Sequence, residues 1–162
     1  MVAEKVTDRE DEFGRFVRLD GERVRRALVA YYGVEIGSEA AAEALAVAWE
    51  RWDDLKDMAN PSGYLYRVGQ SQARPHIRWA ARRRTFPAGD LPAPTAETAG
   101  LIDVFHALSR LKPEQRTALL LVKSYGYSHR DVAELMRTSE ATVNNLVHRG
   151  LLRLRSFLEV TP

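Results

Sequence analysis

The side chains whose types and spacing most clearly suit a specific chemical role lie in the last quarter of the 162-residue chain. An asparagine can pair bidentately with adenine, and a glutamate can accept a hydrogen bond from the cytosine amino group. Ser and Thr at the start of a helix cap it and can also reach a base edge, whereas basic residues contact phosphates and fix position without reading sequence. The candidate base-reading residues are Ser139, Glu140, Thr142, Asn144 and Asn145, and the candidate phosphate contacts are Arg137, His148, Arg149 and Arg153.

A second group of candidates lies in a basic stretch near the middle of the chain. Residues 58–89 contain six arginines and no Asp or Glu, whereas the charged residues of 39–57 are six acidic and two basic ones. Segregated charge of this kind creates one surface that attracts polyanions, although any single arginine could simply be solvated. Trp79 lies among the arginines and is a candidate nucleic-acid contact. Trp49 and Trp52 are spaced for a helix and are expected to be core residues.

The residues that enzymes use are not arranged for catalysis. The four histidines are scattered without metal-ligand spacing, and the chain has no Cys, no glycine-rich phosphate loop and no Gly-x-Ser-x-Gly motif. We therefore expect no enzyme activity, no cofactor, no metal and no small-molecule substrate. Residues 1–12 are too charged for a secretory signal, and the apolar runs are too short to span a membrane. These features predict a cytoplasmic protein without membrane contact.

The elements that position these candidates are predicted to be helices in two blocks, residues 7–84 and 101–160. Between them, Pro87, Pro92 and Pro94 cannot continue a helix and favour an extended tether. The sequence therefore predicts an all-α protein of two small helical domains, residues 1–84 and 101–162, joined by a Pro-rich linker at residues 85–100.

Local signals mark the helices of both blocks. In the first, an amphipathic helix is expected from Ser38, and Asn60 with Pro61 opens another, which Pro75 is expected to kink or break. In the second, Pro113 opens a helix that Gly126 ends. A capping box at 128–131 starts a short helix, and a tight turn at 137–139 leads into a longer one. A short helix, a tight turn and a longer helix form a helix-turn-helix.

Residues 107–155 carry a motif that is similar to the C-terminal domain of bacterial extracytoplasmic-function (ECF) sigma factors. The matching segments are Leu111 to Arg116, Gly126 to Ser128, Asp131 to Ala133, Thr142-Val143 with His148-Arg149, and Arg153 to Arg155. The resemblance implies that this domain reads the minus-thirty-five promoter element.

The first block resembles the N-terminal domain of the same family less closely. Glu43 and Ala48-Trp49 resemble its helix that binds core RNA polymerase, and residues 64–68 with Ala73 and residues 76–78 resemble its helix that melts and reads the minus-ten element. The resemblance implies polymerase contacts at Glu39, Ala42, Glu43, Val47 and Glu50, and minus-ten contacts at Tyr64, Arg67, Gln70, Ser71, Arg74, Arg78 and Trp79.

The chain departs from the family pattern at several of these positions. Ala42 stands where Gln is usual, Gln70-Ser71 where Arg-Asn is usual, Pro75 where Asp is usual, and Asn144 where a basic residue is common. We predict a sigma factor that directs core RNA polymerase to promoter DNA, with an anti-sigma protein as a further expected partner. Two alternatives stay open: a degenerate sigma-like regulator that binds DNA or polymerase without initiating, and a sigma-like scaffold for a regulatory protein.

Overall fold

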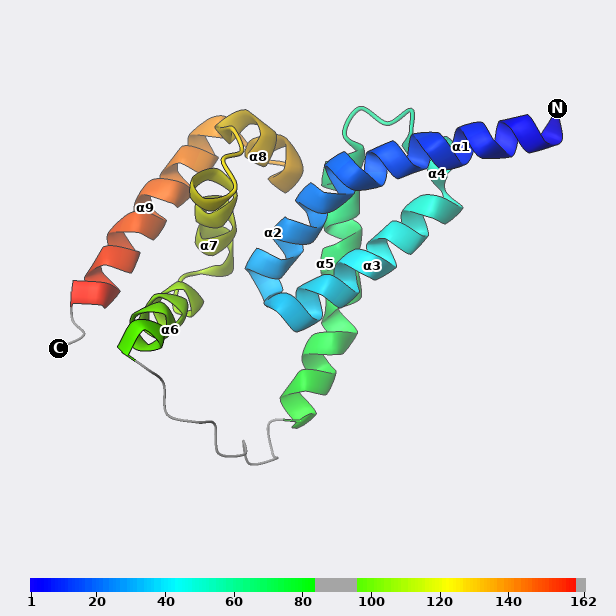
Figure 1. Ribbon diagram of the computed structural model, residues 1–162. Helices are drawn as coiled ribbons and strands as arrows, with labels where there is room; N and C mark the ends of the chain where they lie inside the picture. Colours follow the sequence, from blue (N-terminus) through cyan, green and yellow to red (C-terminus); the bar gives the residue numbers. More distant parts are fainter. Residues whose placement is uncertain (84–95, 160–162) are drawn as a thin grey trace.

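The computed structural model describes residues 1–83 and 96–159, and every regular element in these ranges is a helix (Figure 1). The first block contains α1 (Val2–Phe16), the π-helical turn η1 (Val17–Gly21), α2 (Glu22–Tyr32), α3 (Val34–Glu50), α4 (Trp52–Leu55) and α5 (Pro61–Arg83). The second contains α6 (Ala96–Ser109), α7 (Pro113–Leu119), the π-helical turn η2 (Leu120–Ser124), α8 (His129–Met136) and α9 (Glu140–Glu159). The all-α prediction is confirmed.

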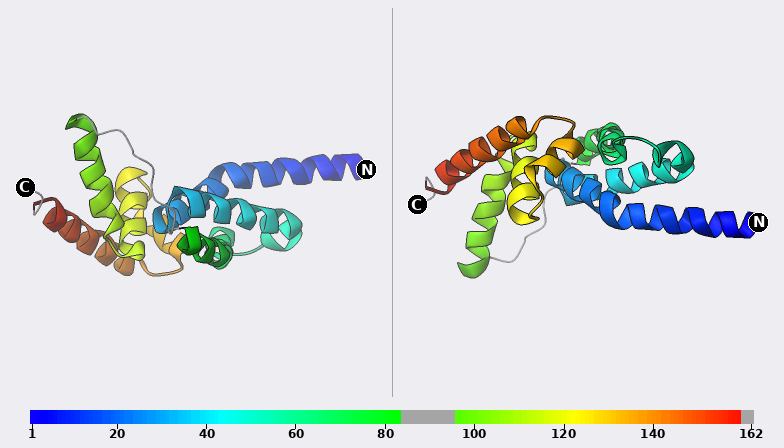
Figure 2. Two further views of the ribbon diagram at one scale, coloured as in Figure 1. Left: turned by 90° about the horizontal axis from the view of Figure 1, so that it is seen from below. Right: turned by 90° about the horizontal axis from the view of Figure 1, so that it is seen from above.

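The core of the first block lies between α2, α3 and α5. Val24, Leu28 and Leu65 are fully buried there, and α2 packs along both α3 and α5. Gly33, with φ of 90°, turns the chain between α2 and α3, so α3 begins at Val34 rather than at the expected Ser38. The first part of α1 projects away from this core in all three views (Figures 1 and 2).

The long helix α5 starts at the predicted cap and continues through its internal proline. The Asn60 side chain accepts a hydrogen bond from the Gly63 amide at 2.9 Å, which confirms the predicted N-cap. A break at Pro75 is excluded, because α5 continues through it to Arg83, whereas the alternative of a kink there stays a prediction. Pro75 is exposed, so its ring meets solvent rather than a neighbouring helix, and the helix has to tolerate only the missing amide donor and the contact of the ring with the Ser71 carbonyl.

The two neighbouring tryptophans have different environments. Trp52 is buried at 5% exposure and packs edge-on against Phe13, which confirms it as a core residue. Trp49 is 36% exposed, so its assignment to the core is wrong. It lies one residue beyond the buried row Ala41, Ala44 and Ala48, about 100° further around α3. There the Arg9 guanidinium covers its ring at 4.3 Å from the ring centroid.

The second block is the predicted helix-turn-helix. The Ser128 hydroxyl accepts from the Asp131 amide at 3.0 Å, and the Ser139 hydroxyl accepts from the Thr142 amide at 3.1 Å, so both predicted N-caps are confirmed. Arg137 closes α8 in the left-handed conformation, with φ of 55°. Buried Val132 and Val143 lie in the core cluster that joins α8 to α9.

The two blocks pack closely against each other. α2 lies along α7, α5 touches α8, and buried residues of both blocks belong to one hydrophobic cluster (Figures 1 and 2). α6 begins at Ala96, so residues 96–100 of the expected linker are helical. Residues 84–95, with the three linker prolines, lie outside the described residues.

Candidate nucleic-acid interface

The outer face of α9 presents the candidate recognition residues to solvent. Ser139, Glu140, Thr142, Asn144, Asn145, His148, Arg149 and Arg153 are all exposed, and so is Arg137 in the turn before the helix. The opposite face holds Val143, Val147 and Gly150 against the rest of the second block. Because the buried row fixes the rotation of α9, the polar row must face outward.

The exposed residues of α9 form two rows rather than one. Thr142, Asn145 and Arg149 follow one another at steps of three and four, and with Lys112 and Glu114 they line a shallow hollow of about 270 Å³. Asn144 and His148 lie four residues apart on the other side of the outer face. Each row therefore pairs an amide side chain with a basic one, an arrangement that can place one group on a base edge and the other on a phosphate.

Four of the candidate residues of α5 share one exposed stripe. Arg67, Ser71, Arg74 and Arg78 are all exposed and recur at steps of four, three and four. We call these four residues the α5 stripe. Three guanidinium groups on one helix face make a positive track of the kind that follows a nucleic-acid backbone.

The remaining three candidates of α5 flank the stripe. Trp79 is 52% exposed, so its ring is accessible as a stacking surface. Gln70 is half-buried, and so is Tyr64. The Tyr64 hydroxyl accepts a hydrogen bond from Arg51 at 2.7 Å, which ties that ring to the C-terminal end of α3.

The candidate polymerase contacts share the solvent face of α3. Glu39, Ala42 and Glu50 are exposed, and Glu43 and Val47 are half-buried on the same side of the helix. We call these five residues the α3 face. A hydrogen bond of 2.9 Å between the Glu43 carboxylate and His76 Nε2 links the α3 face to α5. A partner that binds α3 would therefore also contact the residue next to Pro75.

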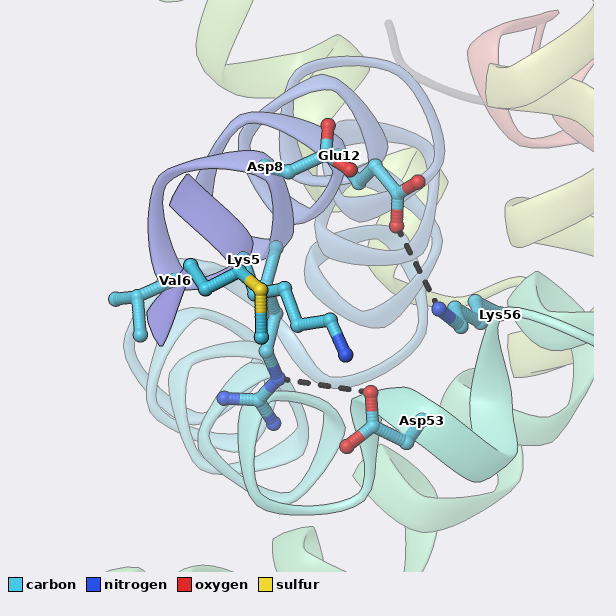
Figure 3. Close-up of a pocket in the computed structure, with 8 residues that line it drawn as sticks. Lys5, Val6, Asp8, Glu12, Asp53 and Lys56 are labelled. Carbon is cyan, nitrogen blue, oxygen red and sulfur yellow. Dashed lines mark ion pairs between the residues drawn. The ribbon is translucent and has the colours of Figure 1, made fainter. Parts of the chain in front are cut away.

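A hollow of about 520 Å³ between α1 and the α4 region contains none of the predicted site residues (Figure 3). Two exposed ion pairs cross it, Arg9 to Asp53 at 3.7 Å and Lys56 to Glu12 at 3.8 Å. Charges of both signs line it, so it does not favour a polyanion. These pairs connect the middle of α1 to the α4 region.

Neither a metal centre nor a membrane span emerges from the described residues. Within residues 1–83 and 96–159 no three His, Asp or Glu side chains gather as a metal-binding group. In the same part of the chain, the helices are too short or too polar to cross a bilayer.

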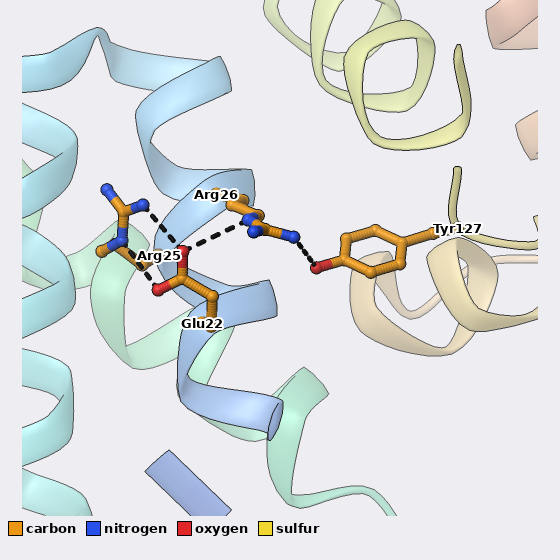
Figure 4. Close-up of polar contacts among 4 residues, drawn as sticks. All are labelled: Glu22, Arg25, Arg26 and Tyr127. Atoms are coloured by element: carbon orange, nitrogen blue, oxygen red, sulfur yellow. Dashed lines mark hydrogen bonds and ion pairs between the residues drawn. The ribbon is translucent and has the colours of Figure 1, made fainter. Parts of the chain in front are cut away.

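Sequence reasoning missed the residues that connect the two blocks. Figure 4 shows Arg26 of α2 reaching the Tyr127 hydroxyl, to which it donates a hydrogen bond of 2.7 Å, while its Nε donates to Glu22. Hydrogen bonding to Arg25 lowers the pKa of Glu22. Tyr127 and Arg116 lie within the quoted motif, but nothing in its spacing indicated that the first block would be their partner.

The capped helix-turn-helix and the exposed polar face of α9 define a protein of the helix-turn-helix class. The family model for sigma-70, region 4, matches residues 101–154. The chain is 31% identical over 125 residues to the RNA polymerase sigma-E factor of Streptomyces avermitilis, covering 72% of this chain and 67% of that protein. The chain therefore belongs to the ECF RNA polymerase sigma factor family.

Two mycobacterial relatives agree with this assignment. The ECF RNA polymerase sigma factor SigJ of Mycobacterium tuberculosis is 30% identical over 146 residues, covering 80% of this chain and 47% of SigJ. SigM of the same species is 31% identical over 127 residues, covering 76% of this chain and 65% of SigM. The chain thus spans from about half to two thirds of the length of these relatives. Sigma factors are non-enzymatic RNA polymerase subunits, which confirms that the chain is not an enzyme.

A solved structure supports the fold. The sigma factor RpoE in a complex with the anti-sigma factor NepR, from Bartonella quintana, superposes with a TM-score of 0.62 at 21% identity. The superposition covers 93% of this chain and 99% of that one. The two-domain sigma fold therefore extends over both blocks.

Proposed function

We propose that this chain directs core RNA polymerase to specific promoters and starts transcription there. The observation that carries the proposal is the separation of three exposed polar surfaces onto three helices: the α3 face, the α5 stripe and the outer face of α9. Three separate surfaces match the three contacts that such a protein needs, with polymerase and with two DNA elements.

The α3 face is the proposed polymerase contact. It combines the carboxylates of Glu39, Glu43 and Glu50 with a small apolar centre at Ala42 and Val47. An acidic rim around an apolar centre suits a basic protein surface better than DNA, which carries negative charge itself. The Glu43–His76 bond then places the bound polymerase next to α5.

The α5 stripe is the proposed minus-ten contact, and α9 is the proposed minus-thirty-five contact. The stripe offers positive charge, with Trp79 beside it to stack on a base that has left the duplex. α9 offers amides and hydroxyls at the end of a helix that can enter the major groove. We expect this work to take place in the cytoplasm, with no small molecule or cofactor. The RpoE–NepR complex suggests that an anti-sigma protein regulates this chain as well.

A second candidate function is that of a sigma-like regulator that binds without initiating. Two features of α5 favour it. Gln70 is half-buried and stands where the family usually has Arg, and Pro75 occupies a stretch of helix where the family usually has Asp. Both lie in the helix that would have to open the promoter.

Run-off transcription with purified bacterial core polymerase, on a pool of genomic promoter fragments, tests the proposal. The wild-type chain should give transcripts that core polymerase alone does not give. Arg74→Glu should reduce them at least 10-fold, because it reverses a charge on the α5 stripe. Arg18→Glu is the matched control, since Arg18 is also exposed but lies on η1, outside the three surfaces.

Two results would contradict the proposal. DNA binding by the wild-type chain without any transcript would favour the regulator. Equal losses with Arg74→Glu and Arg18→Glu would mean that net charge, rather than the α5 stripe, governs the activity.

A further inference from the structure

A buried glutamine of α7 lies beside α9 with part of its hydrogen-bonding capacity unused. Gln115 is 7% exposed, and its side-chain oxygen Oε1 is buried without a hydrogen-bond partner among the described residues. A buried acceptor without a partner costs free energy, because water bonds to that oxygen in the unfolded chain. An apolar side chain of similar size would avoid this cost, so the stability of the free chain does not account for a glutamine at this position.

The packing of α7 on α9 places Gln115 next to the middle of α9. A Cβ atom added at Gly150 would lie 3.4 Å from the Gln115 backbone oxygen and 3.7 Å from the Gln115 Cβ. The next residue of α7, Arg116, donates hydrogen bonds of 2.6 Å to the carbonyls of Ala30 and Tyr31 in α2. Neighbouring residues of a helix point about 100° apart, so Gln115 faces α9 while Arg116 faces the first block.

Gln115 and Arg149 line the same small hollow. The hollow of about 270 Å³ that contains Thr142, Asn145 and Arg149 also has Gln115 on its wall, and we call it the α7–α9 hollow. Arg149 directly precedes Gly150, so its side chain starts close to the Gln115 Cβ. Within the described residues, the exposed Arg149 guanidinium makes no hydrogen bond and no ion pair. The hollow therefore brings an unused cationic donor close to an unused buried acceptor.

Glu114 is a competing acceptor on the same hollow. Its carboxylate is exposed and accepts a hydrogen bond of 3.2 Å from the Tyr31 hydroxyl. Water and salt weaken an ion pair at an exposed carboxylate, whereas the buried amide oxygen of Gln115 is shielded from both. A carboxylate would also cancel the positive charge that a phosphate requires. A neutral amide can orient the Arg149 guanidinium and leave its charge intact.

We propose that Gln115 positions Arg149 for its contact with the DNA backbone. When a phosphate is bound, the Arg149 guanidinium donates one hydrogen bond to Gln115 Oε1 and uses its other donors to hold the phosphate. A guanidinium carries five N–H donors in a planar fork, so it can bond both groups at once. The buried oxygen thus gains its partner in the DNA-bound chain. This inference rests on the proposed function, because it takes α9 as the minus-thirty-five contact and Arg149 as one of its phosphate contacts.

Double-mutant cycles in DNA binding test the inference. Gln115→Met replaces the amide by an apolar group of similar shape, and Arg149→Ala removes the guanidinium. Arg155→Ala is the matched control, since Arg155 is an exposed arginine of α9 outside the α7–α9 hollow. The Kd of the full chain, alone and with core polymerase, is measured by fluorescence anisotropy at several salt concentrations. The probe is the duplex that the wild-type chain binds most tightly among the promoter fragments of the run-off pool, and thermal melts give the Tm of each variant.

The three backgrounds should respond differently to Gln115→Met. Kd should rise about 10-fold in the wild-type and Arg155→Ala backgrounds, but less than about 2-fold with Arg149→Ala, because the hydrogen bond to the charged group is then already lost. In the wild-type background, Gln115→Met should also lower the salt slope of binding by about one, as expected for the loss of one phosphate contact. The Tm should stay the same or rise, because the variant no longer buries an acceptor without a partner.

Several results would overturn the inference. Equal losses of affinity in all three backgrounds, or a Tm that falls together with the affinity, would mean that Gln115 is only a structural residue. Absence of binding to every duplex, with and without core polymerase, would remove the phosphate contact itself. A failed run-off assay with the Gln115–Arg149 coupling intact would overturn the proposed function alone, whereas transcripts without that coupling would overturn this inference alone.

Discussion

Gly37 is the position at which the packing of α3 on α2 can be tested most sharply. A Cβ atom added at Gly37 would lie 2.5 Å from the Leu28 carbonyl oxygen and 2.5 Å from the Val29 Cα. Both neighbours are backbone atoms, so no side-chain rotation can relieve the contact. Gly37→Ala must therefore push α2 and α3 apart.

The expected cost follows from two opposing effects. Overpacking in a close-packed interior costs about 1–3 kcal/mol, and the backbone contact places Gly37→Ala at the upper end. Replacing glycine by alanine within a helix stabilises the folded state by about 1 kcal/mol. We expect a net loss of about 2 kcal/mol, which corresponds to a fall in Tm of about 4–8 °C for a chain of this size.

Gly14→Ala is the matched control within α1. There the added Cβ would meet only the end of the flexible Arg18 side chain, at 3.3 Å. The control should therefore keep or raise Tm, because alanine in a helix adds up to about 1 kcal/mol to the free energy of unfolding. Thermal melts followed by circular dichroism measure both variants. If Gly37→Ala melts at or above the wild-type temperature, the close approach of α2 and α3 is not as described.

Three further results are expected. Asn144→Ala should relax base preference at one or two promoter positions, at a cost of about 1–3 kcal/mol in binding free energy. Arg149→Ala should instead weaken binding to all sequences and flatten the salt dependence of binding, as titrations at several salt concentrations would show. Uniform losses in both variants would contradict the division of roles. Pro75→Ala should raise Tm, because Pro75 is exposed within a continuous helix, and permanganate reactivity of the minus-ten thymines would show whether promoter opening falls with it. Limited proteolysis should cut first within residues 85–95, and the packing of α2 on α7 and of α5 on α8 predicts that the two fragments elute together in gel filtration. Primary cleavage inside a helical block would contradict the two-domain assignment.

Local signals predicted the second block accurately because its chemistry is local. The hydroxyls of Ser128 and Ser139 each accept from the backbone amide three residues later in the chain, so sequence spacing alone identifies both caps. The outer face of α9 followed in the same way from the apolar row that includes Val143 and Val147.

The first block was harder to predict where tertiary contacts decide the outcome. Trp49 has the spacing of a core residue, but its position around α3 is set by the alanine row that packs against α2 and α5. Pro75 normally disrupts a helix, yet the structure accommodates it at an exposed position. The partners of Arg26 and Arg116 lie about 85 to 101 residues away in the chain, so no local pattern could indicate them.

The most direct test of the central claim is permanganate footprinting of promoter DNA bound by core polymerase and this chain. The account predicts unpaired, reactive thymines in the minus-ten region with the wild-type chain, and a strong reduction with Arg74→Glu. Promoters that are bound by the wild-type complex but show no reactive thymine at any site would contradict it.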